Sequence, residues 1–598
     1  MKQSCIKLLF VLSITCESER SLARCIMSGT ICIPLREKRR KLTRQPTISS
    51  LLAAKAIAEN EILTLSADAL REGTVLNQLA REHLDAFHRV ADWPTKHRRL
   101  TWGSIGSAAD GFAVAMQACK MPIQRRGTEF VQLFACEADA HKRAWVNSVV
   151  NGELRTQSNQ SGQDKVCIFC SHDDLDKSRS QCHAHDTQCP VPSVDVLFAC
   201  ASEKDTDRKD AGAGRSVLRR LFAYLDTHSV QIVIFVNTQN ASEACGRVKD
   251  DTPPVNMFCA EMSSRGFEGQ RLILDDSCFG LPHLRKKLYG VFVKTTNGLG
   301  PGILGPTADF RRRSVADLFT SLKLLVKMCQ RFPPDVEDVL LRPDDQAIEM
   351  ELLRCVRDGA AVDDGGWLSA VHKLYMKLRL PINVGSPFSS TYNSPWFHVL
   401  SPAQKSMLIY HQRHIVASKT EVCAAFRQAD DTSVARDFVS KFMIDLAPTS
   451  GTLSSSSQYE FGSEKREVAP CLSSKQRWWL HSRSGPERLM LPRESLVLQA
   501  YPVGSDMFAQ RLGHVKGPHE RFLSDLTGTS LPLTVVVAVF LAAWRAVIWR
   551  DAEDDTKAIE KAFHIEPATA EEESLVDDLL ATALGQQTEP AAETALDQ

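Results

Sequence analysis

Residues 194–207, VDVLFACASEKDTD, begin as an apolar run and end as a loop of small and charged residues. This change is typical of a buried strand that delivers a functional loop to the edge of a parallel sheet. Glu203 stands near the tip of that loop. The stretch therefore predicts a parallel strand and places a carboxylate where a reactive group is expected.

Six more apolar runs of strand length flank this stretch and alternate with amphipathic patterns such as DGFAVAMQACK and SVLRRLFAYLD. Such alternation predicts an α/β fold built on a Rossmann-like, doubly wound, mostly parallel sheet. In this kind of sheet, functional side chains collect in the loops at the carboxyl ends of the strands. The six runs are LTWGSI, FVQLFAC, KVCIFC, VQIVIFVN, RLILDD and KLYGVFVK.

Shifts in composition divide the chain into five expected parts. The strand–helix alternation fades near residue 298 and returns near residue 486; between them, helical pieces mix with loops rich in proline and serine. The C-terminal residues are acidic and rich in alanine and threonine, which predicts disorder. The parts are a partly helical N-terminal extension (1–95), an α/β core (96–297), an irregular and helical insertion (298–485), a return to the core (486–550) and an acidic tail (551–598).

The overall composition indicates an intracellular protein without a polyanion-binding field. Seventy-two basic residues balance 72 acidic ones, and the 18 cysteines are scattered through apolar segments, as in a reducing compartment. A nuclear or cytoplasmic location is expected. The signal-like start MKQSCIKLLFVLSIT and the basic residues 36–44 leave three interpretations: a cryptic secretory or organelle signal, a nuclear-import cluster, or an over-extended start of the chain.

The apolar residues 531–549 are the second stretch that could be taken for a membrane span. They reach about the minimum spanning length, but Arg545 lies well inside. A helix buried against the sheet is the favoured interpretation, so no stable membrane insertion is expected.

Short motifs occur in a fixed order along the α/β core. The first four are a glycine-containing loop, an acidic strand end, the stretch 194–207 and an Asn-containing strand end. The last three are a Pro-x-x-Arg loop, an Arg-Glu helix start and a Gly-Thr loop. In order and spacing they resemble the cytosine-5 DNA methyltransferases, over roughly residues 98–300 and 486–550. The family places its target-recognition domain where the insertion is expected. The segments are TWGSIGSAADGFAVAMQAC, LFACEADAHKRAW, VDVLFACASEKDTD, IVIFVNTQN, FGLPHLRKKLYGVFV, RLMLPRESLVLQAYP and LTGTSLP.

The resemblance implies S-adenosyl-L-methionine as cofactor, DNA as partner and flipping of the target base out of the helix. A small-residue turn lets backbone amides approach a cofactor, and a carboxylate at a strand end can accept hydrogen bonds from a ribose. For Glu137 the alternative is a solvated helix N-terminus. The cofactor candidates are Ser107, Ala108 and Gly111 in the first loop, Glu137 at the second strand end, Asp173 (or Ser171) after the third strand, and Thr529 in the last loop.

Two positions that carry the family's chemistry are substituted. Methyl transfer to C5 of cytosine needs a thiolate that adds to C6 and an acid near N3. Glu203 stands at the cysteine position and Val236 at the glutamate position. Arg285 retains one of the family's paired arginines, and Lys287 replaces the other. Losing either reactive group removes several kcal/mol of transition-state stabilisation. An impaired or inactive homologue is therefore expected, and the alternative is an active enzyme that uses Cys200, with RNA as a second substrate class.

A cysteine- and histidine-rich segment, CIFCSHDDLDKSRSQCHAHDTQC (residues 167–189), stands apart from the family motifs. A C-x-x-C pair followed by further cysteines and histidines is typical of zinc binding, with Cys167, Cys170, Cys182 and His185 as the candidate ligands. The alternative is a set of buried cysteines followed by a polar loop. A zinc-stabilised or nucleic-acid-binding interaction module on a decayed methyltransferase scaffold is thus the competing function.

Two further motifs lie near the end of the insertion. In RLMLPRESLVLQAYP the family pattern is well preserved, and its expected role is structural, tying the insertion back to the sheet. In KQRWWLHSRSG, basic residues surround Trp478 and Trp479, which suggests contact with phosphates and stacking on a base. The alternative is that the two indoles belong to a core.

Overall fold

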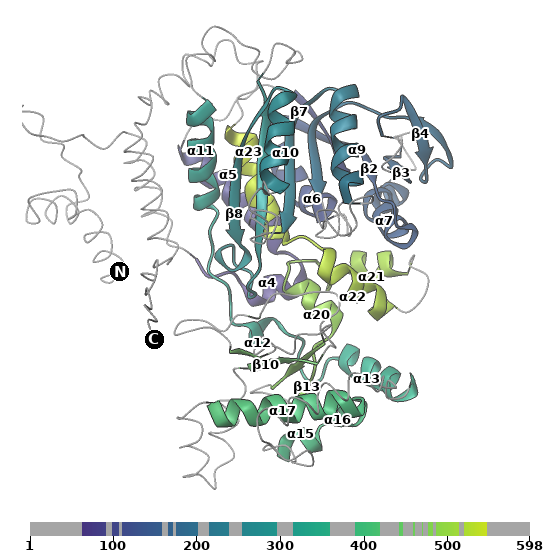
Figure 1. Cartoon of the computed structure of the whole chain (residues 1–598), viewed down its shortest axis with the longest axis vertical. Coiled ribbons are helices and arrows are strands. Elements are labelled where there is room, and N and C mark those ends of the chain that lie inside the picture. Colours follow the sequence, from purple (N-terminus) through teal and green to yellow (C-terminus); the bar gives the residue numbers. More distant parts are fainter. Residues whose placement is uncertain are drawn as a thin grey trace, which may run out of the picture.

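The computed structural model describes residues 63–90, 98–106, 111–157, 165–171, 175–200, 214–238, 254–295, 315–358, 389–418, 442–446, 458–460, 469, 477–481, 486–513 and 519–546. These residues form a main body around a large sheet and a smaller lobe at one end of it (Figure 1).

The main body is built on a nine-stranded sheet of order β5-β4-β3-β2-β1-β6-β7-β9-β8. Strands β3, β2, β1, β6 and β7 pair in parallel, while β9 runs antiparallel between β7 and β8. This arrangement confirms the predicted Rossmann-like fold, and all seven predicted runs are strands of the sheet. The strands are β1 (Arg98–Ile105), β2 (Thr128–Cys136), β3 (Cys167–Phe169), β4 (Arg179–Cys182), β5 (Thr187–Pro190), β6 (Val194–Cys200), β7 (Val230–Thr238), β8 (Phe267–Asp275) and β9 (Lys286–Lys294).

The strand order brings the family-like motifs to one edge. Strand β1 lies between β2 and β6, so the connections on its two sides diverge, which opens a crevice at the carboxyl ends in folds of this type. The register aligns Ile105 with Cys136 on one side and with Ala199 on the other, and Cys200 with Val236. The carboxyl ends of β1, β2, β6 and β7 therefore lie side by side.

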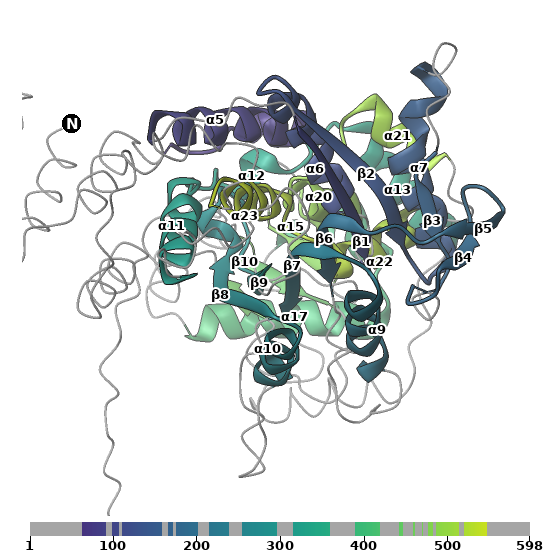
Figure 2. The same ribbon diagram turned by 90° about the horizontal axis from the view of Figure 1, so that it is seen from above.

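Helices cover both faces of the sheet (Figure 2). Helices α5, α6, α11 and α23 pack together on one face, and α9 and α10 lie on the other. Two of the first group come from segments expected to lie outside the core: α5 from the N-terminal extension and α11 from the insertion. The helices of the main body are α4 (Ala67–Glu72), α5 (Val75–Val90), α6 (Gly111–Gln124), α7 (Ala140–Gln157), α9 (Gly214–Thr227), α10 (Pro254–Ser264), η4 (Asp276–Cys278), α11 (Val315–Met328), α12 (Val336–Val339), α20 (Pro492–Val497), α21 (Asp506–Leu512), α22 (His519–Thr529) and α23 (Leu533–Ala546).

Alternation along the strands supplies both layers of the core. In β6, Val196 and Phe198 face the α6 and α23 layer, while Leu197 and Ala199 face the α9 layer. Helix α23 is buried from Leu533 to Arg545, as expected for an apolar helix packed on the sheet. Among the described residues no single helix is long and apolar enough to span a membrane; α22 and α23 together pass by length and composition, with a 43° bend between them.

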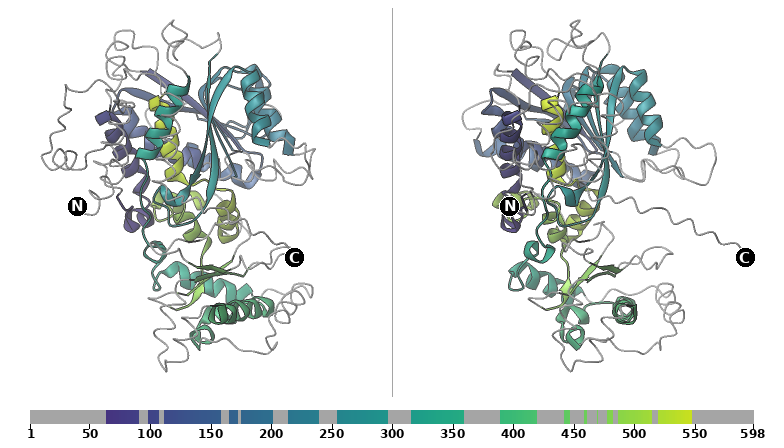
Figure 3. Two further views of the ribbon diagram at one scale, coloured as in Figure 1. Left: turned by 60° about the vertical axis from the view of Figure 1, so that its left-hand side comes forward. Right: turned by 90° about the vertical axis from the view of Figure 1, so that its left-hand side faces the viewer.

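The smaller lobe has its own sheet and core (Figure 3). Its sheet, of order β11-β10-β12-β13, is antiparallel and packs on short helices. Trp478 and Trp479 are 2% and 0% exposed, so both indoles belong to cores and neither is available to stack on a base. The elements are α13 (Gln346–Asp358), α15 (Ser389–Asn393), α16 (Pro395–His398), α17 (Pro402–Ser418), β10 (Phe442–Asp445), β11 (Gln458–Glu460), β12 (Trp478–Leu480) and β13 (Arg488–Leu489).

Candidate active site

Glu137 follows the carboxyl end of β2, where the ribose-binding carboxylate was expected. It is buried; its Oε1 accepts a hydrogen bond from the Asp139 backbone N–H (3.0 Å), and its own N–H donates to the carbonyl of Phe169 (3.2 Å). Arg143 donates to the carbonyls of Glu137 and Cys170 (3.0 and 3.4 Å). These contacts hold the ends of β2 and β3 together around the carboxylate.

Two glycines shape the end of β1 and the start of α6. Gly106 has φ of +70°, and a Cβ there would lie 2.6 Å from the carbonyl oxygen of Cys200, so only glycine fits between β1 and β6. Sequence reasoning missed this residue, although a glycine directly after an apolar strand was a visible signal. Gly111 begins α6, and a Cβ there would lie 2.7 Å from Tyr501 Oη. Close packing against Tyr501 thus explains Gly111 without a cofactor.

Four expected site residues, Ser107, Ala108, Asp173 and Glu203, lie outside the described residues. Thr529 is described and ends α22, where its hydroxyl donates to two backbone carbonyls of its own last turn (3.0 and 3.3 Å).

Val236 lies in a row of three side chains at the carboxyl end of the central strands. It pairs with Cys200 on β6 and with Tyr289 on β9, and paired residues project from the same face of a sheet. Val236 and Tyr289 are fully buried, and Cys200 is half-buried. Within the described residues the Tyr289 hydroxyl has no hydrogen-bond partner. A buried hydroxyl therefore lies beside Val236, the position at which the sequence motifs predict the family's acid.

Arg285 and Lys287 hold the loop that follows α22. Arg285 Nη1 donates to Gln499 Oε1 (2.9 Å) and its Nη2 donates to the carbonyl of Gly528 (2.9 Å). The Lys287 ammonium, which is buried, donates to the carbonyl of Ser530 (3.1 Å). Both cations therefore connect the start of β9 to the last family-like loop, which lies more than two hundred residues later in the sequence.

Asp276 and His283 form a buried pair beside these cations. Both side chains are fully buried, with 3.7 Å between His283 Nδ1 and Asp276 Oδ2, and no hydrogen-bond partner exists for either among the described residues. Burial raises the pKa of Asp276 well above its usual value, although the positive charges of Arg285 and Lys287 oppose this. Burial, and then the same charges, lower the pKa of His283 well below its usual value. Burial therefore favours the uncharged form of both groups.

Replacing Asp276 with asparagine is expected to change how stability depends on pH. Folded Asp276 keeps a proton that the unfolded chain loses above about pH 4, so the residue lowers stability as pH rises from there. His283 acts in the opposite sense, because below about pH 6.5 the unfolded chain takes up a proton that the folded chain does not. Each slope is at most about 1.4 kcal/mol per pH unit, and in the wild type they oppose each other between about pH 4 and 6.5.

The Asp276→Asn variant should therefore exceed the wild type in stability at neutral pH and lose that advantage as the pH approaches 4. Urea unfolding at several pH values measures this, with Asp68→Asn as the control because the Asp68 side chain is 72% exposed. If the free energies of unfolding of Asp276→Asn and the wild type changed in parallel with pH, Asp276 would not have the raised pKa described above.

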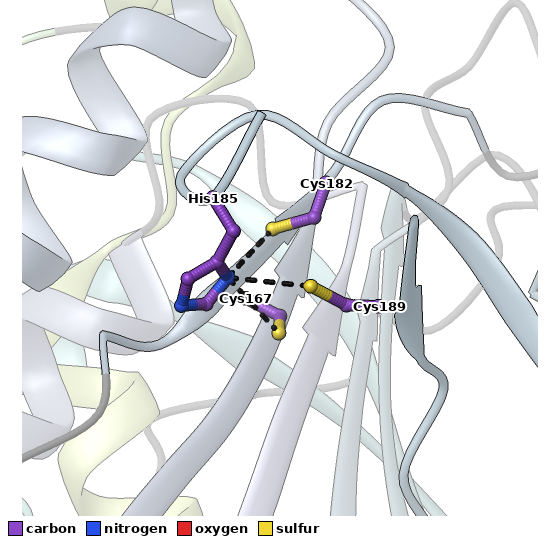
Figure 4. Close-up of side chains that lie close together, drawn as sticks. All are labelled: Cys167, Cys182, His185 and Cys189. Carbon is purple, nitrogen blue, oxygen red and sulfur yellow. Dashed lines mark hydrogen bonds between the residues drawn. The ribbon is translucent and has the colours of Figure 1, made fainter. Parts of the chain in front are cut away.

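A second group of reactive side chains lies at the edge of the sheet formed by β3, β4 and β5 (Figure 4). Cys167, Cys182, His185 and Cys189 bring their ligand atoms within 4.8 Å of one another. A hydrogen bond from Cys167, followed by those from His185, lowers the pKa of Cys182 to about 4. The structure has Cys189 in this group in place of the expected Cys170. Cys167 and Cys170 are three residues apart on and just beyond an extended strand, so they point to opposite faces.

Comparison with known proteins gives one curated relative at significant similarity. No protein-family model matches the chain. It is 21% identical over 470 residues to the DNA (cytosine-5-)-methyltransferase DMT5 of Cryptococcus neoformans; the alignment covers 75% of this chain and 17% of that protein. The chain thus spans about one sixth of the length of this relative.

Solved structures similar to this chain carry methyltransferase descriptions. The Dnmt2 methyltransferase of S. pombe is 11% identical with a TM-score of 0.33, and covers 74% of this chain and 97% of its own. A putative DNA modification methyltransferase of an E. coli prophage is 12% identical with a TM-score of 0.33, and covers 75% and 99%.

The sequence match covers three quarters of this chain, and the described strand ends of the family-like motifs lie together at the carboxyl-terminal edge of a sheet of the expected type. The chain is similar in sequence to a cytosine-5 DNA methyltransferase, and its main sheet has the Rossmann-like topology that its motifs predict.

Proposed function

We propose that this chain is a DNA cytosine-5 methyltransferase homologue that binds S-adenosyl-L-methionine and DNA but is impaired or inactive in methyl transfer. The observation that carries the proposal is the substitution of both reactive positions. Glu203 stands where the family has its nucleophilic cysteine, and Val236 stands where it has its acid. A carboxylate does not form the same reversible adduct at C6, and a valine donates no proton.

The position of Val236 supports a loss of the acid. Its side chain is fully buried between Cys200 and Tyr289, so no water or mobile side chain can easily take the place of the missing carboxyl group. Cys200, the alternative nucleophile, ends β6 and lies in the sheet, three residues before Glu203. It is packed against the main core, as expected for a structural cysteine.

The cofactor side of the site is better preserved. Glu137 is fixed at the end of β2 by the Asp139 N–H and by Arg143, which binds the neighbouring carbonyls. Gly106 and the parallel strands around it form the kind of edge that binds nucleotides in doubly wound folds. When bound, S-adenosyl-L-methionine would supply an electrophilic methyl group, and Glu137 would hold its ribose hydroxyls.

Calorimetry with S-adenosyl-L-methionine and a transfer assay with cytosine-containing DNA test the proposal together. The wild type should bind the cofactor and transfer no detectable methyl group. Glu137→Gln should weaken cofactor binding by about tenfold or more. A carboxylate accepts hydrogen bonds at two oxygens, whereas the glutamine amide has one accepting oxygen and one donating NH₂ group. Glu129→Gln is the matched control, since Glu129 lies at the opposite end of β2 and its side chain is 60% exposed.

Two outcomes would contradict the proposal. Absence of cofactor binding by the folded wild type would favour the interaction module on a decayed scaffold. Robust methyl transfer by the wild type would remove the claim of impaired chemistry, and its loss in Cys200→Ala would then assign the nucleophile to Cys200.

A further inference from the structure

The group formed by Cys167, Cys182, His185 and Cys189 has a common centre. His185 Nδ1 lies 3.6 Å from the sulfur of Cys167, 3.3 Å from that of Cys182 and 3.4 Å from that of Cys189. Figure 4 shows the three sulfurs turned toward one edge of the imidazole ring. Four side chains from β3, β4, the turn after β4 and β5 thus converge on a single point.

These separations match the edges of a zinc coordination tetrahedron. With Zn–S of about 2.3 Å and Zn–N of about 2.0 Å, ideal tetrahedral angles put nitrogen and sulfur about 3.5 Å apart and two sulfurs about 3.8 Å apart. The three nitrogen–sulfur distances lie within a few tenths of an ångström of that value. Three thiolates and one imidazole are soft and borderline ligands, which select zinc over magnesium, calcium or manganese.

We propose that Cys167, Cys182, His185 and Cys189 bind one zinc ion in a closed, four-ligand structural site. All four positions of the tetrahedron are filled by protein atoms, so none remains for a substrate or an activated water. The Ile168 backbone N–H donates to the sulfur of Cys182 (3.3 Å), which stabilises negative charge on a metal-bound thiolate. This inference is independent of the proposed methyltransferase-like function.

The fold explains what such an ion does. The hairpin of β4 and β5 has four residues in each strand, and its buried side chains are those of Ser180, Cys182 and Cys189. A two-stranded hairpin with so little apolar surface is marginal in water. It meets the parallel sheet through one residue pair, Phe169 with Cys182. Zinc would join β3 directly to both strands of the hairpin and to its turn.

Metal analysis of the purified full-length chain tests the site. Elemental analysis by plasma mass spectrometry should find about one zinc per chain and no comparable amount of iron. Cys189→Ser and His185→Ala should lower the zinc content at least about tenfold. Cys170→Ser is the matched control and should keep its zinc, because its sulfur lies outside the group although its spacing from Cys167 looks metal-like in the sequence.

Cobalt substitution separates metal binding from a simple failure to fold. The Co²⁺-loaded wild type should show the visible bands of tetrahedral cobalt with thiolate charge transfer. His185→Cys should retain the metal and shift these bands, because a fourth sulfur replaces the nitrogen. Removal of zinc by a chelator should lower the melting temperature by at least about 5 °C, and added zinc should restore it.

Two results would overturn the proposal. One is a folded wild-type chain that contains no zinc and takes up neither zinc nor cobalt. The other is a zinc content that stays near one per chain in both Cys189→Ser and His185→Ala.

Discussion

Glu494→Gln is expected to lower the free energy of unfolding by about 3–5 kcal/mol, because it breaks a buried ion pair and leaves one charge without its partner. Both oxygens of Glu494 accept from the Arg488 guanidinium at 2.7 Å, and the two side chains are 1% and 6% exposed. The backbone N–H groups of Leu341 and Leu491 donate to the same oxygens (2.9 and 2.8 Å). Glutamine offers one acceptor oxygen to these four donors and has no charge to balance Arg488.

Urea unfolding followed by tryptophan emission measures the effect. Trp479 and its neighbour lie in β12, which pairs with β13, so the signal reports on the sheet that contains Arg488. The matched control is Asp358→Asn, which breaks an Arg354–Asp358 ion pair of the same 2.7 Å length whose side chains are 36% and 47% exposed. That change should stay within about 0.5 kcal/mol of the wild type. An equal decrease in the free energy of unfolding in Glu494→Gln and Asp358→Asn would contradict the stabilising role assigned to the buried Arg488–Glu494 pair.

One part of the environment of this ion pair could be predicted from the sequence and another part could not. The preserved Arg488 and Glu494 predicted that the motif ties the insertion back to the sheet. The partner on the other side, Leu341, could not be predicted, since nothing local marks a backbone N–H that lies more than 150 residues away. Seven of the nine strands of the main sheet were predicted, because their apolar runs act locally. Strands β4 (RSQC) and β5 (TQCP) have no such run and were not predicted. The placement of β9 between β7 and β8 depends on long-range pairing, which no local pattern in the sequence reveals.

Helices and ligands were harder to place than strands. Helices α5 and α11 show amphipathic patterns, but a pattern reveals only that a face is buried, not that α23 is its partner. At the cysteine-rich segment, the C-x-x-C spacing indicated Cys170, whereas the side-chain alternation of β3 turns that sulfur away and the hairpin brings Cys189 in. The spacing of the cysteines therefore identifies the metal ligands only once the positions of β3, β4 and β5 are known.

The double variant Glu203→Cys with Val236→Glu is expected to gain methyl transfer to cytosine-containing DNA, whereas the proposed function predicts no detectable transfer by the wild type. The two changes return the thiolate and the acid together, and each alone should leave the reaction without one essential group. Because a general acid or base contributes about 10²–10⁴-fold, the double variant should exceed either single variant by at least about 10²-fold. Transfer of label from S-adenosyl-L-methionine to DNA measures it.

A matched control keeps the acid and the shape but omits the thiolate. Glu203→Ser with Val236→Glu should remain inactive while binding the cofactor as the double variant does, which separates lost chemistry from a damaged fold. Equal transfer by the serine and cysteine versions would contradict the role assigned to position 203.

The acid introduced at position 236 enters a fully buried site, where a carboxylate without a partner costs several kcal/mol. Tyr289 is positioned to offset that cost, since it pairs with Val236 across β7 and β9 and its hydroxyl has no partner among the described residues. Tyr289→Phe should therefore act in opposite directions in two backgrounds. In the wild type it removes an unsatisfied buried hydroxyl and should leave stability unchanged or raise it by about 1 kcal/mol. In the double variant it should lower both stability and methyl transfer, because it removes the donor that the new carboxylate needs.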